Sequence, residues 1–126
     1  MTTISIYLAA LYSRREEMEE IAKRLRDEGY DITSRWVYGE EEGKTNEDIA
    51  IFDIDDLDDA DTVISFTQPY GTMYKGGGRN VEFGYGYAEN KRMILIGERE
   101  NVFHWLPSVE QFNTIEDFLT YEQTTP

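Results

Sequence analysis

The chain has 126 residues, with 26 acidic and 12 basic side chains, a formal net charge of −14 and no cysteine. This length suits a single domain over 1–126, because a second hydrophobic core would lack the residues to fill it. Without cysteine there is no disulfide, no thiolate metal site and no cysteine nucleophile. The charge argues against a nucleic acid or an anionic membrane as main partner, but it allows a small phosphorylated ligand in a locally positive pocket.

The acidic side chains are concentrated in one segment. Residues 40–61 hold eleven acidic residues and one lysine, and so account for −10 of the net charge. Runs of this kind are typical of a solvated surface. The apolar segment 4–12 is too short to span a bilayer, which takes about 20 residues, and no basic stretch precedes it. We therefore expect a cytoplasmic domain with no membrane partner.

Hydrophobic periodicity predicts strands and helices in alternation along the chain. Strands are expected over 3–8, 31–36, 62–66 and 92–97, and the pattern permits a fifth over 109–112. Helices are expected from a capping box at Ser13 and Glu16 to a stop at Gly29, over 46–60, over 80–90, and after a cap formed by Thr114 and Asp117. This order predicts an α/β fold with a parallel sheet covered by helices on both faces. Because such sheets bind ligands at the carboxyl ends of their strands, we expect the site in the loops 9–14 and 67–82.

Asp53 stands out within the acidic segment. On a helical wheel it falls inside the apolar arc that Ile54 and Leu57 define, whereas Asp55 and Asp58 point away from that arc. A buried carboxylate without a partner is costly. Two interpretations remain open: a structural hydrogen bond or salt bridge, or a carboxylate directed into the ligand cleft.

Glu82 is the second candidate, because it follows the glycine-rich segment 76–80 where a loop passes into a helix. Glycines let the backbone approach a ligand closely, and a helix start offers unpaired amides to an anion. A glutamate near a helix start also compensates the helix dipole, which is a purely structural role. Paired carboxylates such as Glu82 and Asp53 are nevertheless the usual means of cleaving a glycosidic bond.

Other signals are weaker. Gly43-Lys44-Thr45 resembles the end of a phosphate-binding loop, but Tyr38 stands where the first glycine is required, which excludes that motif. His104 has no cysteine or second histidine to join it, so we expect no metal site. Several side chains near the two loops fit either a phosphate site or a solvated surface: Ser13, Arg14, Arg15 and Arg79. Four tyrosines fit either base stacking or core packing: Tyr7, Tyr12, Tyr70 and Tyr74.

Three segments in combination resemble the nucleoside 2-deoxyribosyltransferase superfamily, which includes the 2′-deoxynucleoside 5′-monophosphate N-hydrolases. They are 6–14, with Ile-Tyr-Leu-Ala-Ala before Ser-Arg; 53–61, with Asp-x-x-x-Leu-x-x-Ala-Asp; and 77–88, where the glycines lead to Glu-x-Gly-x-x-x-Ala. The resemblance extends over about 4–119. It implies a single flavodoxin-like, Rossmann-like three-layer domain with a five-stranded parallel sheet. It also implies no metal or other cofactor, and a homodimer or higher homo-oligomer with shared active sites.

The resemblance further implies a role for individual residues. Glu82 matches the nucleophile that forms a covalent glycosyl-enzyme, and Asp53 matches an acid that orients this nucleophile or assists the departing base. Tyr7 matches an aromatic residue beside the sugar, and Asn101 lies in a segment that reaches into the neighbouring subunit's site. The expected substrate-binding residues are Ala9, Ser13, Arg14, Gly76, Gly77, Gly78, Arg79, Asn80 and Asn101.

The predicted function is cleavage or transfer at the N-glycosidic bond of a 2′-deoxynucleoside, with hydrolysis of a 2′-deoxynucleoside 5′-monophosphate as the alternative. Transferases of this superfamily often carry an aspartate where this chain has Gly76, whereas Arg79 suits a 5′-phosphate, so the choice between them stays open. A non-catalytic nucleotide-binding or interaction domain is the alternative from another class. An acidic DNA mimic would leave Glu82 unexplained, and a receiver domain would need an aspartate where Thr67 and Gln68 stand.

Overall fold

The protein is built on a parallel β-sheet, seen in a computed structural model that describes residues 3–41, 43–68 and 77–124. Five strands lie in the order β2-β1-β3-β4-β5, and every neighbouring pair is parallel. The strands are β1 (Ser5–Ala9), β2 (Asp31–Ile32), β3 (Thr62–Phe66), β4 (Arg92–Ile96) and β5 (Val109–Phe112). The predicted α/β fold with a five-stranded parallel sheet is confirmed.

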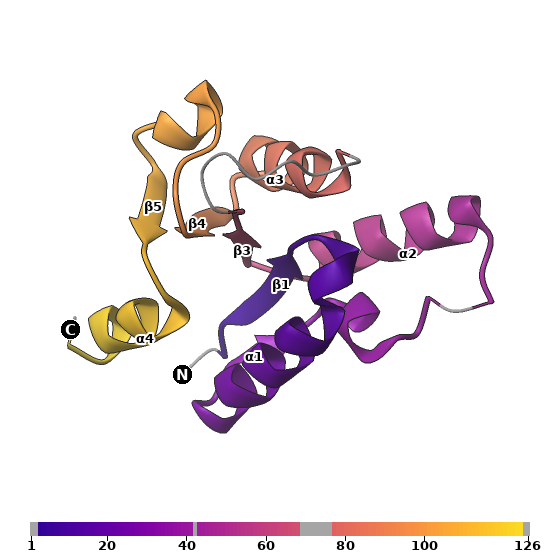
Figure 1. Ribbon diagram of the computed structural model, residues 1–126, viewed down its shortest axis with the longest axis horizontal. Coiled ribbons are helices and arrows are strands. Elements are labelled where there is room, and N and C mark those ends of the chain that lie inside the picture. Colours follow the sequence, from indigo (N-terminus) through magenta and orange to yellow (C-terminus); the bar gives the residue numbers. More distant parts are fainter. Residues whose placement is uncertain (1–2, 42, 69–76, 125–126) are drawn as a thin grey trace.

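Helices cover both faces of the sheet and give the protein three layers. They are α1 (Arg15–Asp27), α2 (Asn46–Asp58), α3 (Gly78–Ala88) and α4 (Ile115–Thr124), with 3₁₀ turns η1 (Tyr12–Arg14), η2 (Arg35–Tyr38) and η3 (Val102–Trp105). Figure 1 shows α1 and α4 on one side of the sheet and α2 and α3 on the other. The central strand β3 is buried along its whole length, so the core lies on both of its faces.

The start of α1 differs from the predicted capping box. The helix begins at Arg15, and no side chain caps it, because Ser13 already lies inside η1 and lacks the extended backbone that an N-cap needs. Two other predicted helix ends are confirmed: Gly29 has a φ of +95°, and the hydroxyl of Thr114 accepts a hydrogen bond from the amide of Asp117 at 3.1 Å. The helices predicted over 46–60 and 80–90 lie at Asn46–Asp58 and Gly78–Ala88.

The second strand is shorter than predicted, because side chains take over its hydrogen bonds to β1. The hydroxyl of Ser34 accepts from the amide of Leu8 at 3.0 Å, and the indole of Trp36 donates to the carbonyl of Leu8 at 2.8 Å. The strand therefore ends at Ile32, and the chain turns into η2 with Trp36 buried.

Helix α2 has one buried acidic residue that the helical wheel did not single out. Asp56 is 2% exposed and binds Arg35, whose backbone amide and Nε each donate to its carboxylate at 2.9 Å. Ala50, nearer the start of the helix, is exposed, whereas Leu57 near its end is fully buried. Within the described residues, no helix is both long enough and apolar enough to cross a bilayer.

Candidate active site

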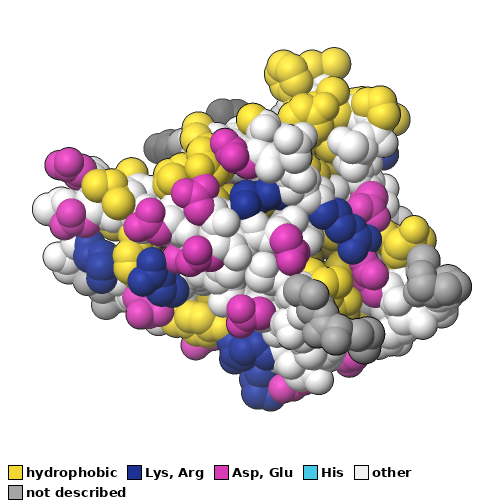
Figure 2. Space-filling model, turned by 180° about the vertical axis from the view of Figure 1, so that it is seen from behind, with side chains coloured by type: hydrophobic (Ala, Val, Ile, Leu, Met, Phe, Trp, Pro, Cys, Tyr) yellow, Lys and Arg dark blue, Asp and Glu magenta, His cyan; other side chains and the backbone are white. Residues whose placement is uncertain are grey.

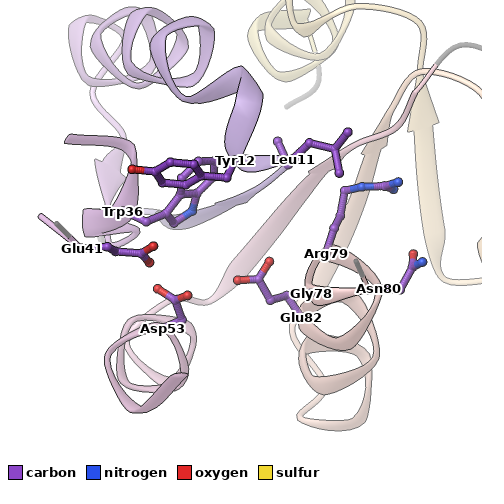
Figure 3. A pocket seen from close by; sticks show the side chains of 11 residues that line it. Leu11, Tyr12, Trp36, Glu41, Asp53, Gly78, Arg79, Asn80 and Glu82 are labelled. Carbon is purple, nitrogen blue, oxygen red and sulfur yellow. The ribbon is translucent and has the colours of Figure 1, made fainter. Parts of the chain in front are cut away.

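A pocket lies where the carboxyl end of β1 meets the N-terminal end of α3. Figure 3 shows its side chains, which come from five places in the chain: the segment after β1, η2, the loop that follows η2, α2 and α3. The lining residues are Ala10, Leu11, Tyr12, Trp36, Glu41, Asp53, Gly77, Gly78, Arg79, Asn80 and Glu82. Its position matches the edge of the sheet at which the sequence predicted a site.

Glu82 and Tyr7 are joined at the floor of this pocket. The hydroxyl of Tyr7, a fully buried residue of β1, donates a hydrogen bond to Oε2 of Glu82 in α3. Burial raises the pKa of Glu82 to about 7; the negative charge of Glu41 adds to this rise, while the Tyr7 bond and Arg79 oppose it. A partly buried carboxylate held by one hydroxyl is well suited to act as a nucleophile on a ligand in the pocket.

Asp53 faces the same pocket from α2, in agreement with its place on the helical wheel. Burial raises its pKa to about 8, and the neighbouring carboxylates of Glu41, Glu82 and Asp56 contribute to this rise. At neutral pH this side chain therefore carries a proton for much of the time, as a general acid requires.

Glu41 is a third carboxylate in the pocket and was not predicted from the sequence. It lies in the loop between η2 and α2, and Figure 3 shows its carboxylate turned toward that of Asp53. Nothing in the sequence separates it from the other acidic residues of 40–61, most of which are solvated. Glu41 reaches the site only because folding places this loop beside Asp53.

An aromatic wall borders the pocket opposite the carboxylates. The rings of Tyr12 and Trp36 lie 6.2 Å apart between centroids, tilted by 38°. Trp36 is held in place by its bond to Leu8, whereas Tyr12 is 52% exposed and lies at the mouth. A planar group such as a nucleobase can stack here. The role of Trp36 was missed because its segment was predicted to be a strand.

The first turn of α3 leaves room for an anion. At Gly77 and Gly78 an added Cβ atom would meet nothing within 4 Å, so the backbone is open to the pocket. The amides at the start of the helix have no acceptor within the helix, and Asn80 lies beside them. Gly76, which was predicted to bind substrate, lies outside the described residues.

Arg79 lines the pocket, but its charge is directed elsewhere. Its guanidinium forms a bidentate ion pair with Glu100, in the loop after β4, and its side chain is 3% exposed. The predicted phosphate contact of Arg79 therefore does not match the geometry: the guanidinium would have to leave Glu100 to reach a ligand. The pair instead ties the start of α3 to the β4–η3 loop.

Four other predicted binding residues lie outside this pocket. Ala9 is buried in the sheet one residue before the lining begins, and Ser13 is exposed on η1. Arg14 borders a second hollow, where it donates to the carbonyl of Thr67 at 3.2 Å. Asn101 caps η3 by accepting a bond from the amide of Phe103, and it borders an apolar groove on the outer face of α3.

A metal centre finds no support in the described part of the chain, where no three histidine, cysteine or carboxylate side chains are grouped to hold an ion. His104 is buried beside Phe83, and its Nδ1 accepts a bond from the amide of Glu100 at 2.9 Å. It therefore supports the loop that carries Glu100.

Comparisons with known proteins identify a solved structure with the same fold. No family model matches the chain, and no curated protein sequence does. Among solved structures, the CMP N-glycosidase BcmB of Clostridium botulinum matches with a TM-score of 0.65 over 96% of this chain and 99% of that chain, at 16% sequence identity. Five parallel strands in the order 2-1-3-4-5 between layers of helices, matched over almost the full length of both chains, give this protein the fold of that N-glycosidase.

Proposed function

We propose that this protein cleaves the N-glycosidic bond of a nucleotide or nucleoside. The observation that carries the proposal is the pairing of two carboxylates with different surroundings in one pocket: Glu82 is held by Tyr7, and Asp53 has a pKa high enough to keep a proton. Two carboxyl groups in different surroundings can take the separate roles of nucleophile and acid. The aromatic wall of Tyr12 and Trp36 and the fold of a CMP N-glycosidase support the same activity.

The proposed mechanism has two steps. An oxygen of Glu82 attacks C1′ of the sugar while the bond from C1′ to the base breaks, and the electron pair of that bond leaves with the base nitrogen. Asp53 gives the base its proton. Water then attacks C1′, releases the sugar from Glu82 and returns a proton to Asp53. The two carboxyl groups supply the nucleophile and the acid, so the reaction requires no metal or redox cofactor.

The substrate that fits best carries a 5′-phosphate. The open amides from Gly77 to Asn80 lie beside Glu82 and suit a phosphate on the sugar that Glu82 attacks. This favours hydrolysis of a nucleoside 5′-monophosphate, with transfer of a 2-deoxyribosyl group to a second base as the other outcome of the same covalent intermediate. A deoxyribose and a ribose substrate are both included in the test below.

We also propose that a second copy of the chain completes the site. The pocket has a volume of about 240 Å³, which is below the roughly 300–1,000 Å³ of most small-molecule sites. Large apolar side chains are exposed on α3 and η3: Val81, Tyr87, Val102, Phe103 and Trp105. Figure 2 shows hydrophobic side chains gathered at the end of the molecule where η3 lies. Asn101 lies on this face, where it would contact the neighbouring protomer.

The activity is tested by incubating the protein with ribo- and deoxyribonucleoside 5′-monophosphates and with the corresponding nucleosides, and by measuring the free base. Glu82→Gln is expected to lower base release at least about a thousandfold, because the nucleophile is lost. Glu89→Gln removes the same charge from an exposed position after α3 and should leave the rate unchanged.

Three outcomes separate the alternatives. Exchange of the base when an acceptor base is added, without net hydrolysis, identifies a transferase. Binding of nucleotides without any release of base identifies a non-catalytic domain and contradicts the proposal. Base release that persists in Glu82→Gln contradicts the assigned nucleophile.

A further inference from the structure

Two buried carboxylate oxygens in the pocket have no hydrogen-bond donor among the described residues. They are Oε1 of Glu41 and Oδ1 of Asp53. The two side chains come from different elements, the loop after η2 and helix α2, and Figure 3 shows their carboxylates facing one another. A buried acceptor without a donor is costly, and two ionised carboxylates side by side repel each other.

Three cationic or hydroxyl groups near this pair, all among the described residues, are engaged elsewhere. Arg79 is paired with Glu100, the hydroxyl of Tyr7 donates to Glu82, and Arg35 is bound to Asp56. Two further carboxylates among the described residues act on the pair: Glu82 from α3 and Asp56 from within α2 both disfavour ionised Asp53. The group that best satisfies both unpartnered oxygens is a proton held between them.

We propose that Glu41 and Asp53 share one proton, and that Glu41 is the positioning residue that keeps Asp53 able to protonate the leaving base. This inference rests on the proposed N-glycosidic cleavage and adds to it a residue outside the motifs that carry the family resemblance. When the bond from C1′ to the base nitrogen breaks, the electron pair goes to the base and the shared proton follows it. The pair is then fully ionised, and it recovers its proton from the water that releases the sugar from Glu82.

The pH dependence of base release tests this arrangement. The acid must be protonated, so activity is lost as the pH rises through the pKa of Asp53. In Glu41→Gln the negative charge is gone and an amide can donate to ionised Asp53, so the pKa of Asp53 falls and this basic limb moves to lower pH by at least about one unit. The acidic limb moves in the same direction, because Glu41 also raises the pKa of Glu82. We expect kcat/KM to fall about tenfold at pH 8 and to change little at pH 6.

The matched control is Glu40→Gln, which removes the same charge from the adjacent exposed position and should leave both limbs in place. A role of Glu41 in folding or in substrate contact alone would lower activity equally at every pH, and that result would overturn the proposal. Infrared difference spectra give a second measurement that does not depend on turnover. Glu82 is itself partly protonated near pH 7, so the spectra are recorded on Glu82→Gln. In that background the C=O band of a protonated carboxyl at neutral pH should disappear with Asp53→Asn and weaken with Glu41→Gln.

The failure of this inference is distinguishable from that of the proposed function. If the wild-type protein releases no base from any substrate, the proposed function fails, while the infrared band still reports whether the proton is shared. If base is released and depends on Glu82, but the pH profile of Glu41→Gln equals that of the wild type, only the role of Glu41 fails.

Discussion

Tyr7 sets the ionisation of the proposed nucleophile through a single hydrogen bond. Its hydroxyl donates to Glu82 and so opposes the rise in pKa that burial imposes on that carboxyl. In Tyr7→Phe the ring still fills the core, but the bond is lost and the pKa of Glu82 rises above about 7. Because the nucleophile must be ionised, the acidic limb of the pH–rate profile should move to higher pH, and activity should fall more at pH 6.5 than at pH 8.

Tyr85→Phe is the matched control for this change. Tyr85 lies in α3 and, like Tyr7, donates to a carboxylate, that of Asp58, but this contact is at the surface and away from the pocket. This variant should keep the wild-type profile. An acidic limb that stays in place in Tyr7→Phe would contradict the role of the bond, whatever the absolute rate.

Individual site residues could be predicted from the sequence only where a local pattern marks them. Asp53 falls inside the apolar arc of its helix and Glu82 follows a glycine-rich segment, so both were identified, and the structure brings both into one pocket. Glu41 carries no such mark among the acidic residues around it. Arg79 was expected to bind a phosphate. Its ion pair with Glu100 could not be predicted, because Glu100 lies in a loop that only the folded sheet brings near Arg79.

At the scale of elements, Gly84 and Gly86 of α3 have different surroundings. A Cβ atom at Gly86 would lie 2.8 Å from Cγ2 of Val63 and 3.2 Å from the sulfur of Met93, both in the sheet, whereas at Gly84 it would meet nothing within 4 Å. Gly86→Ala is therefore expected to lower the midpoint of thermal unfolding, because overpacking typically costs about 1–3 kcal/mol. Gly84→Ala should leave the unfolding of the isolated chain unchanged or raise it, since alanine favours a helix by up to about 1 kcal/mol.

Both variants replace a glycine of α3 by alanine. They differ only in the face of the helix that carries the added methyl group. The midpoints of thermal unfolding of the two variants are compared at low protein concentration. Equal effects at both positions would mean that helix α3 does not rest on β3 and β4 through Gly86.

The elements themselves were largely predictable because their signals are local. Hydrophobic runs marked the three central strands, and Gly29 and Thr114 marked helix ends that the structure confirms. The errors occurred where a contact between distant residues decides the backbone. β2 ends early because the side chains of Ser34 and Trp36 form hydrogen bonds to the backbone of β1. No local pattern in the segment 31–36, which was predicted to be a strand, indicates either bond.

At the scale of the whole molecule, the net charge of −14 is unevenly distributed. Most of it lies on α2 and its flanking loops, while five of the eight large apolar side chains exposed in the described residues lie on α3 and η3. Figure 1 shows η3 away from α2. Two copies that meet through α3 and η3 would keep their acidic segments out of the contact. Their mutual repulsion would then act only at long range and be screened by salt.

Phe103 tests whether this apolar face joins two copies. It is 64% exposed, so the change to glutamate costs the isolated chain little, but it would bury a charge in the proposed contact. The wild type is expected to sediment at about twice 14.7 kDa and to associate more strongly as salt is raised, and Phe103→Glu to sediment as a single chain. Ile51→Glu, at a position 55% exposed on α2, adds the same charge outside the contact and should remain a dimer. If a second copy completes the site, base release should fall with dimerisation in Phe103→Glu alone. A wild-type protein that is active as a single chain would contradict both the contact and the shared site.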